Sequence, residues 1–207
     1  NFGKSGYGRE DIFYSVREKN GWSKPINMGS TINTDGYEGF PSVSPDGKRL
    51  YFTREAVGKN VNEKQCYRIM VSEKGRNGKW KEPFELLPPI NFDCEKAPRI
   101  MADSRTLVFS SIKKGGKGDF DLYKSVLQDN GTWSEPLPLE FINTKKSDLF
   151  VAISPCGDLM YFVSNGDIYT TPVPEELRPF KIATIQGFVV DSLTKAQALF
   201  EEENFVM

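Results

Sequence analysis

Short runs of apolar, aromatic and β-branched residues alternate with polar turn segments along most of the chain. Residues 44 to 52 read SPDGKRLYF, in which proline fixes φ, aspartate bonds to nearby backbone and glycine adopts a positive φ. Residues 41 to 44 lead into this turn, and an apolar run at 50 to 53 follows it. The pattern predicts two short strands joined by a turn, a β-hairpin.

The same phrase returns twice, as MADSRTLVF at 101 to 109 and SPCGDLMYF at 154 to 162. A tryptophan preceded by Asn-Gly and followed by proline three residues later also recurs, at Trp22, Trp80 and Trp133, which lie 58 and 53 residues apart. An Ile-Asn pair follows each tryptophan, at Ile32-Asn33, Ile90-Asn91 and Ile142-Asn143. An internal repeat of this length decides the architecture.

A further column of predicted strands precedes each tryptophan and occurs once more near the end of the repeats. It reads DIFYS at 11 to 15, RIMVS at 68 to 72, DLYKS at 121 to 125 and DIYTT at 167 to 171. One unit thus holds four short strands: the strand that ends in the turn, its hairpin partner, the column strand and a tryptophan-containing edge strand. Four antiparallel strands recurring about every fifty residues indicate a β-propeller blade.

The repeat therefore predicts an all-β protein built from four-stranded antiparallel blades. Two units are complete, at about 37 to 90 and about 95 to 139, while the chain opens on the last two strands of an earlier blade and ends on the first three of a later one. Because a ring needs about four blades to close, we expect a partial ring here and further blades before Asn1. We assign residues 1–178 to blades and 179–207 to a linker and the start of a small β-sandwich.

The repeated aromatic and amide columns are expected to be structural. We expect the three tryptophans to pack between neighbouring blades or to cap the sheet edge, with ligand stacking as the alternative. We expect Asn33, Asn91 and Asn143 to close turns with their side-chain amides, as asparagine does in loops.

We predict no catalytic, cofactor-binding or metal-binding residues, and hence not an enzyme. Asp46 resembles a cation ligand, but its counterpart is taken as Ser104 in one repeat and Gly157 or Cys156 in another. No polar column is expected to persist across the repeats. The chain also has no histidine, which removes the commonest general base and zinc ligand, and every Ser-His-Asp or Cys-His mechanism.

Composition and charge narrow the partners. The net charge of -1 gives no long-range attraction to nucleic acid or anionic membrane, and no apolar run reaches the roughly 18 residues of a membrane span, so we predict neither nucleic-acid binding nor direct membrane insertion. The start, NFGKSGYGRE, looks internal to a longer protein. Cys66, Cys94 and Cys156 are judged too few and too scattered for a disulfide framework or a zinc site, and at least one is unpaired within the chain.

Several connecting segments lie outside the predicted strands. The polar, glycine-containing segments 54 to 66 and 113 to 118 are expected to be surface loops between second and third strands, either solvated linkers or partner contacts. Residues 172 to 180, PVPEELRPF, are predicted to form an extended connection or domain boundary. Residues 182 to 191 alternate like a strand, and 195 to 207 are left open between a helix and a second strand.

With these columns in hand, the chain resembles the TolB-like, WD-like β-propeller repeats, whose hallmark is a Ser-Pro-Asp-Gly turn before a Leu-Tyr-Phe strand. The version carrying GWSKP, TWSEP, TINT and FINT is similar to propellers of OmpA-family envelope proteins of Bacteroidetes-type bacteria. The resemblance covers about residues 1 to 172 and departs most in the middle repeat, at MADSRTLVF and PINF.

Residues 185 to 198, IQGFVVDSLTKAQA, resemble the opening of a carboxypeptidase-regulatory-like domain, a small β-sandwich whose first strand reads GxVxDxxTxxP. Gly187, Val189, Asp191 and Thr194 match this pattern, and its proline is absent. A propeller, such a domain and an OmpA-like peptidoglycan-binding domain form the layout of PorE-like components of the type IX secretion system. Peptidoglycan would therefore be reached only through domains outside this chain.

These resemblances imply a non-catalytic periplasmic scaffold, associated with the outer membrane, whose propeller holds protein partners of an envelope or type IX secretion assembly. The alternative is a glycan-binding or glycan-cleaving module, because propellers with aromatic rims bind sugars and paired carboxylates cleave them. Against it, Asp46 and Gly47 are adjacent, whereas the sialidase-type Asp box separates these residues by one position. A third hypothesis, a propeller that gates a peptidase, needs a hydrolase domain elsewhere in the protein.

Overall fold

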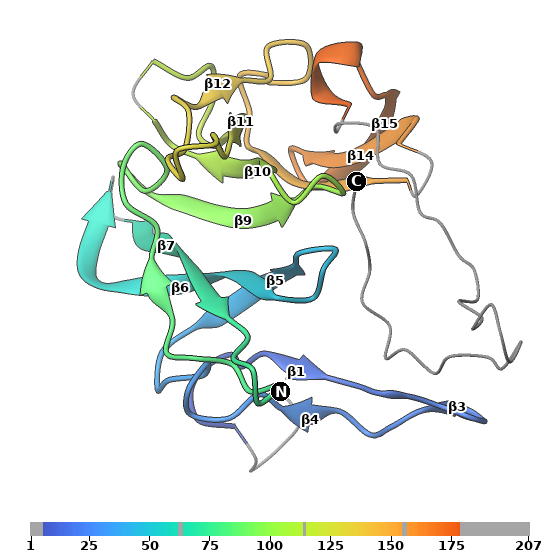
Figure 1. Ribbon diagram of the computed structural model, residues 1–207. Coiled ribbons are helices and arrows are strands. Elements are labelled where there is room, and N and C mark those ends of the chain that lie inside the picture. Colours follow the sequence, from blue (N-terminus) through green and yellow to red (C-terminus); the bar gives the residue numbers. More distant parts are fainter. Residues whose placement is uncertain (1–5, 62–63, 114, 155–156, 179–207) are drawn as a thin grey trace, which may run out of the picture.

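The computed structural model describes residues 6–61, 64–113, 115–154 and 157–178, and in these ranges the regular structure is almost entirely β (Figure 1). The strands are β1 (Phe13–Tyr14), β2 (Arg17–Glu18), β3 (Gly21–Trp22), β4 (Ile26–Asn27), β5 (Glu38–Val43), β6 (Arg49–Val61), β7 (Lys64–Glu73), β8 (Phe84–Glu85), β9 (Glu95–Ile100), β10 (Thr106–Ser111), β11 (Asp121–Val126), β12 (Leu137–Pro138), β13 (Asp148–Ile153), β14 (Leu159–Ser164) and β15 (Asp167–Pro172). A single 3-10 turn, η1 (Glu175–Leu177), follows β15.

The strands form successive antiparallel sheets, which we call blades 1 to 4. Blade 1 consists of two short ladders, β1 with β4 and β2 with β3, while blade 2 has the order β5-β6-β7-β8 and blade 3 the order β9-β10-β11-β12. Blade 4 is the three-stranded sheet β13-β14-β15. The blades follow one another from blue to orange in Figure 1. This is the predicted class of fold, an all-β chain of propeller-type blades with a fully four-stranded sheet in blades 2 and 3.

The hairpin turn between the first and second strands of a blade is closed by carboxylate and hydroxyl groups. Asp46 Oδ1 accepts hydrogen bonds from Ser44 Oγ (2.5 Å) and from the Lys48 N–H (3.0 Å). Partial burial raises the pKa of Asp46, but these hydrogen bonds and the charges of Lys48 and Arg49 outweigh burial, so the pKa lies below its ordinary value. The carboxylate thus closes the turn.

The structure corrects the sequence alignment of this turn. The residues with positive φ are Gly47 (67°), Ser104 (55°) and Gly157 (72°), so these three occupy the same position. Asp46 therefore corresponds to Asp103 and not to Ser104. Asp103 Oδ1 accepts hydrogen bonds from the N–H groups of Arg105 (2.9 Å) and Thr106 (2.8 Å), which gives it the same turn-closing role.

The hydrophobic core is divided into three clusters, one at each interface between neighbouring blades. Between blades 1 and 2 lie Ile12, Ile32, Leu50, Phe52 and Met70; between blades 2 and 3 lie Tyr51, Ile69, Val71, Leu86, Ile90, Ile100, Leu107, Phe109 and Tyr123; between blades 3 and 4 lie Met101, Val108, Leu122, Leu139, Ile142, Val151, Met160, Phe162, Val173 and Leu177. Neighbouring residues of a central strand alternate between the two faces of its sheet, so each blade contributes to the cluster on either side. Blades therefore stabilise one another face to face.

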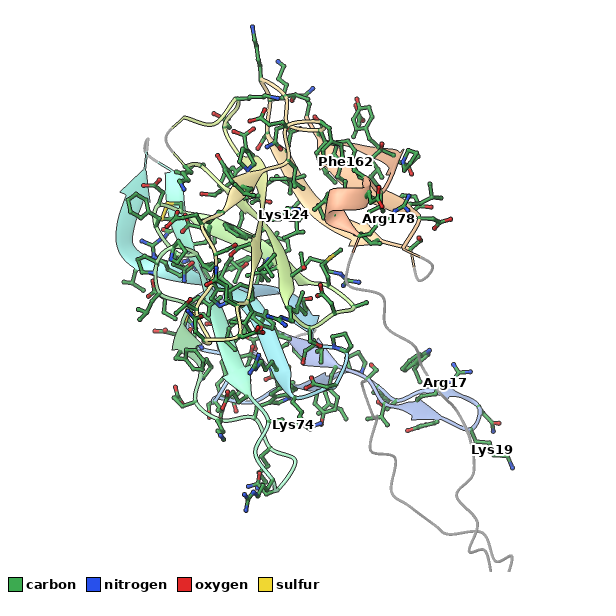
Figure 2. All side chains as sticks on the ribbon, turned by 45° about the horizontal axis from the view of Figure 1, so that its top comes forward. Arg17, Lys19, Lys74, Lys124, Phe162 and Arg178 are labelled. Carbon is green, nitrogen blue, oxygen red and sulfur yellow. A yellow bond between two sulfur atoms is a disulfide. The ribbon has the colours of Figure 1, made fainter. Side chains whose placement is uncertain are left out.

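Two of the three tryptophans pack between blades, as predicted. Trp80 of blade 2 packs on the cluster shared with blade 1, and Trp133 of blade 3 packs on the cluster shared with blade 2, where its ring meets Tyr51 edge to face at 6.4 Å. Trp22 of blade 1 is 66% exposed, and the Arg17 guanidinium lies 5.4 Å from its ring centroid. Figure 2 shows Arg17 on the β2–β3 hairpin that projects from the molecule.

The column asparagines do not close turns with their side chains, which corrects the sequence-based expectation. Each amide instead pairs with both peptide groups of one residue, which lies in the third strand of blades 2 and 3 and directly before β1 in blade 1. The Ile12 N–H donates to Asn33 Oδ1 (2.8 Å) and Asn33 Nδ2 donates to the Ile12 C=O (3.0 Å). The pairs Asn91 with Ile69 (2.9 and 2.8 Å) and Asn143 with Leu122 (2.8 and 2.9 Å) repeat this contact, which we call the amide clip.

Two connecting segments differ from their expected form. Residues 54 to 61 and 64 to 66 are paired strands and not a loop, because β6 and β7 stay paired out to Val61 and Lys64, with an irregularity between Glu55 and Asn60. The stretch after β15 is not simply extended, because η1 brings Val173 and Leu177 into the core. The segment 113 to 118 is a surface connection between β10 and β11, as predicted, with residues 115 to 117 exposed.

Predictions beyond residue 178 lie outside the described residues. They include the strand at 182 to 191 and the carboxypeptidase-regulatory-like match at Gly187, Val189, Asp191 and Thr194. Among the described residues no helix has the length and apolarity that a membrane crossing requires.

Replacing Asn91 by alanine should lower the free energy of unfolding by about 3 kcal/mol, because the buried Ile69 N–H and C=O would lose their side-chain partner. Asn20→Ala, at an exposed position in the β2–β3 turn, should change stability by less than about 0.5 kcal/mol. Urea unfolding followed by tryptophan fluorescence measures both values. Equal stabilities of the two variants would show that the amide clip does not stabilise the fold.

Candidate functional site

The first strands of blades 2, 3 and 4 converge at one place in the molecule. Strand β9 contacts both β5 and β13, and each of these three strands contains a non-glycine residue with positive φ beside a break in register: Phe40 (51°), Ala97 (54°) and Phe150 (52°). The rings of Phe40 and Phe150 approach to 4.8 Å between centroids, although blade 3 separates their blades. Non-glycine residues rarely adopt this conformation, and it is concentrated at sites where the surrounding structure imposes it.

Four aromatic rings form a continuous set at this convergence, which we call the axial aromatic row: Tyr67, Tyr37, Phe40 and Phe150. Tyr37 lies 5.3 Å from Tyr67 and 6.1 Å from Phe40, centroid to centroid. All four side chains are half-buried. A Cβ at Gly39 would lie 2.6 Å from the Tyr37 hydroxyl, so glycine allows the Tyr37 ring to lie close to β5.

The polar surroundings of the row are an ionisable phenol and a cation. Burial raises the pKa of Tyr37 to about 12, with smaller contributions from the nearby Glu10 and Tyr67, so the phenol stays neutral at physiological pH. The Lys96 ammonium lies 4.0 Å from the Phe120 ring centroid and 5.9 Å from that of Tyr67. Cation–π contacts of this kind hold the ammonium against the aromatic surface.

Beside the row, backbone hydrogen bonds connect neighbouring blades. Each joins the segment just before the third strand of one blade to the segment that leads into the next blade, which we call the crossover. Between blades 1 and 2 the Arg9 N–H donates to the Gly36 C=O (2.8 Å), and between blades 3 and 4 the Asp119 N–H donates to the Lys146 C=O (3.3 Å). A Cβ on Gly118 would collide with that Lys146 oxygen, so glycine permits this close approach.

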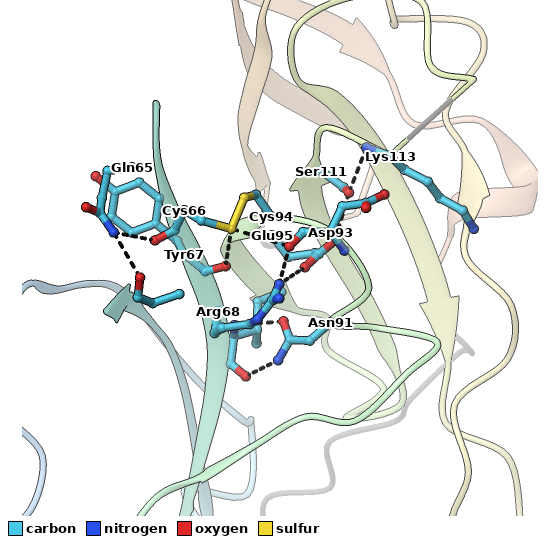
Figure 3. The surroundings of a disulfide bond; sticks show 12 residues. Gln65, Cys66, Tyr67, Arg68, Asn91, Asp93, Cys94, Glu95, Ser111 and Lys113 are labelled. Carbon is cyan, nitrogen blue, oxygen red and sulfur yellow. Dashed lines mark hydrogen bonds and ion pairs between the residues drawn. A yellow bond between two sulfur atoms is a disulfide. The ribbon is translucent and has the colours of Figure 1, made fainter. Parts of the chain in front are cut away.

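Between blades 2 and 3 a disulfide, Cys66–Cys94, takes the place of this backbone hydrogen bond (Figure 3). Each first partner, Arg9, Cys66 or Asp119, lies three residues before the residue held by the amide clip. Each second partner, Gly36, Cys94 or Lys146, lies three residues after the clip asparagine. The sequence-based judgement that the cysteines are too scattered for a disulfide framework is thus wrong for this pair. The pairing could have been predicted from the equivalent positions of the two cysteines within the repeat. Their separation of 28 residues, taken alone, gave no indication of it.

Buried acids form a second polar column, at the start of each first strand, which the sequence analysis missed. Glu38, Glu95 and Asp148 are each at most 1% exposed. Glu38 accepts from the Thr34 N–H (2.8 Å) and pairs with Arg54 (2.9 Å), and Asp148 accepts from the Thr144 N–H (2.6 Å). The prediction that no polar column persists is therefore wrong, and the contacts show that this one organises the crossovers.

Glu95 combines burial with a cationic partner in the disulfide junction. Its carboxylate accepts hydrogen bonds from the Asp93 N–H (2.8 Å) and Ser111 Oγ (3.0 Å), and pairs with Arg68 (3.0 Å) (Figure 3). Burial raises the pKa of Glu95 and outweighs these hydrogen bonds and the Arg68 charge, so its pKa lies above its ordinary value.

The arrangement favours binding over chemistry. The column acids are buried and bonded to backbone or arginine, which keeps them from a substrate, whereas the axial aromatic row keeps part of each ring at the surface. In the described ranges no three His, Cys, Asp or Glu side chains gather as metal ligands would. The predicted absence of catalytic and cofactor-binding residues stays a prediction.

The strand pairing defines the chain as a propeller-type repeat protein. No family model matches the chain, and no curated protein matches it. Two similar solved structures are TolB from Acinetobacter baumannii, with a TM-score of 0.47, 16% identity and coverage of 79% of this chain and 38% of that one, and a putative TolB from Agrobacterium tumefaciens, with a TM-score of 0.28, 14% identity and coverage of 78% and 77%. The chain thus spans 38% of the length of the Acinetobacter baumannii protein.

Replacing Cys66 and Cys94 together by serine should lower the free energy of unfolding by about 3–4 kcal/mol, because the disulfide closes a loop of 28 residues in the unfolded chain. Reductant should lower the stability of the parent by a similar amount and leave the double variant unchanged. Urea unfolding with and without dithiothreitol tests both statements. A parent protein indifferent to reductant would contradict them.

Glu95→Gln should gain stability relative to the parent as pH rises. Because the pKa of Glu95 is raised in the folded state, its favourable contribution is complete below the unfolded pKa and is lost as pH rises through the folded value. The difference in unfolding free energy between variant and parent should therefore grow as pH rises above about 4, the ordinary range of a glutamate. Glu82→Gln, at an exposed position, is the matched control for the substitution itself. If instead the parent becomes more stable relative to Glu95→Gln as pH rises, the charge of Arg68 has a larger effect on the pKa of Glu95 than burial, and the prediction is wrong.

Proposed function

We propose that this chain is a non-catalytic interaction scaffold whose axial aromatic row binds a protein partner. The observation that carries the proposal is the contact of aromatic rings from blades 2 and 4 across blade 3, which creates a half-buried apolar surface on strands held by three inter-blade cores. Aromatic side chains at rigid positions supply much of the binding energy in protein interfaces.

We place this scaffold in the periplasm, in an envelope assembly associated with the outer membrane. The Cys66–Cys94 disulfide supports an oxidising compartment, since such bonds form and persist outside the reducing cytosol. The resemblance to OmpA-family propellers supports the finer proposal of a PorE-like role in type IX secretion. In that arrangement, peptidoglycan contact belongs to domains outside this chain.

Glycan binding is the second candidate, and exposed aromatic rings are what favours it. Trp22, 66% exposed with Arg17 against its ring, presents a flat surface of the kind that sugars stack on. Glycan cleavage receives less support, because the repeated acids of the crossovers are buried and already bonded.

Site-specific photo-crosslinking tests the proposal against its alternative. A photoreactive phenylalanine at Tyr67 should give discrete protein adducts from an envelope extract, whereas the same group at Lys79, in an exposed turn between third and fourth strands, should not. Phe150→Ala should weaken the adducts at position 67, and Leu87→Ala, at an exposed apolar residue outside the row, should leave them unchanged. Absence of adducts together with a positive glycan array would replace this proposal with the second candidate.

A further inference from the structure

Blade 4 lacks, among the described residues, the fourth strand that completes blades 2 and 3. Strand β15 pairs with β14 from Asp167 to Pro172, and no other described strand pairs with it. The equivalent third strands β7 and β11 are each covered on the outer side by β8 or β12. Among the residues that the structure describes, the outer edge of β15 is therefore the one fourth-strand position of blades 2 to 4 without a strand.

The residue of β15 that corresponds to the clipped residues is strongly exposed. In blades 1 to 3 the clipped residues Ile12, Ile69 and Leu122 are 4%, 0% and 1% exposed. Their counterpart in the column DIYTT is Ile168, which is 77% exposed. These counterparts lie in the clusters shared with the following blade, so the exposure of Ile168 marks the face of blade 4 turned away from blade 3. An occupant of the adjoining edge that also covers this face would gain by taking the side chain out of water.

The neighbouring residue marks where a fourth-strand tryptophan would lie. Met70 and Tyr123 belong to the clusters on which Trp80 and Trp133 pack, and they are 9% and 4% exposed. The counterpart in blade 4 is Tyr169, which stacks on Phe162 at 5.8 Å and is 48% exposed. The contacts missing from blade 4 are thus those that a Trp-containing strand makes elsewhere.

The backbone of β15 is set out to receive such a strand. In blade 3 the Leu122 N–H donates to the clip asparagine, and the Leu122 C=O accepts from the Leu139 N–H of the segment after β12. Alternate residues of a strand direct their peptide groups to the same side. Ile168 and Thr170, which correspond to Leu122 and Lys124, therefore present N–H and C=O groups at the outer edge.

We propose that β15 accepts an extended segment of a partner polypeptide that carries a tryptophan followed by an Ile-Asn pair, as the fourth strands of blades 1 to 3 do. Strand addition to an open edge uses backbone hydrogen bonds for affinity and side-chain pockets for selection. Residues 179 to 207 contain neither a tryptophan nor an Ile-Asn pair, and the three such segments of this chain are engaged in their own blades. The segment that we propose is therefore none of these residues, and its site is distinct from the axial aromatic row.

A peptide with the sequence of residues 130 to 143, NGTWSEPLPLEFIN, is the probe for the full 207-residue chain. It should bind saturably in fluorescence anisotropy, and hydrogen exchange should slow at the Ile168 and Thr170 amides. In the peptide, the change equivalent to Asn143→Ala should weaken binding about tenfold, because two hydrogen bonds of the clip are lost. The change equivalent to Glu140→Ala, at an exposed side chain, should alter affinity less than about twofold.

Variants of the chain provide the reciprocal test. Thr170→Pro removes an outward N–H at an edge position where proline is tolerated, and it should abolish binding, whereas Thr170→Val keeps the amide and should bind like the parent. Three results would overturn the proposal: a folded chain that does not bind the peptide, equal affinity for the Asn→Ala peptide, or Ile168 and Thr170 amides already protected without peptide. The last result would mean that the tail of the chain or a second copy covers the edge.

Discussion

The pairing of an asparagine amide with both peptide groups of one residue is the interaction on which the architecture depends. An amide side chain has the same donor and acceptor as a peptide group, so it satisfies the N–H and the C=O of Ile12, Ile69 or Leu122 together. The clip fixes the end of the fourth strand against the third. It also places the isoleucine before each asparagine in the core between two blades. The direction in which the chain enters the next blade follows from this constraint.

Local patterns predicted the parts of the fold whose partners are close in sequence. The SPDG hairpins and the column strands follow from turn chemistry and alternation within a few residues. The packing of Trp80 and Trp133 between blades was predicted on other grounds, because large aromatic rings fill cores even where, as for Trp133 and Tyr51, the partner is far away in the sequence. The clip partner was not predicted, because it lies 21 or 22 residues away and an asparagine in a loop normally bonds locally. The long β6–β7 hairpin was missed because its polar sequence is typical of a loop. Only the pairing of β6 with β7 gives these residues strand structure.

The candidate site was beyond sequence reasoning because it arises from the angle between blades. Phe40 and Phe150 occupy the same position in two different repeats. In blade 3 this position is occupied by Ala97, which is not aromatic. The repeat therefore contains no column of aromatic residues from which the axial aromatic row could be predicted. Its formation requires that three first strands converge, which depends on the face-to-face packing of the blades. The buried acids were missed in a different way, since Glu95 follows its asparagine by four residues and the others by five.

The three blade junctions show that the fold constrains geometry more tightly than chemistry. Blades 1 and 2, and blades 3 and 4, are joined by a backbone hydrogen bond that needs a loop approaching closely, with Gly8 or Gly118 in contact with the facing carbonyl. In blade 2 the extended β7 takes the place of that loop. The Cys66–Cys94 disulfide, and not a backbone hydrogen bond, joins β7 to the crossover into blade 3. A covalent bond at the position of a hydrogen bond keeps blade 3 in the orientation that brings Phe40 and Phe150 together. The disulfide thus supports the axial aromatic row, although neither cysteine belongs to it.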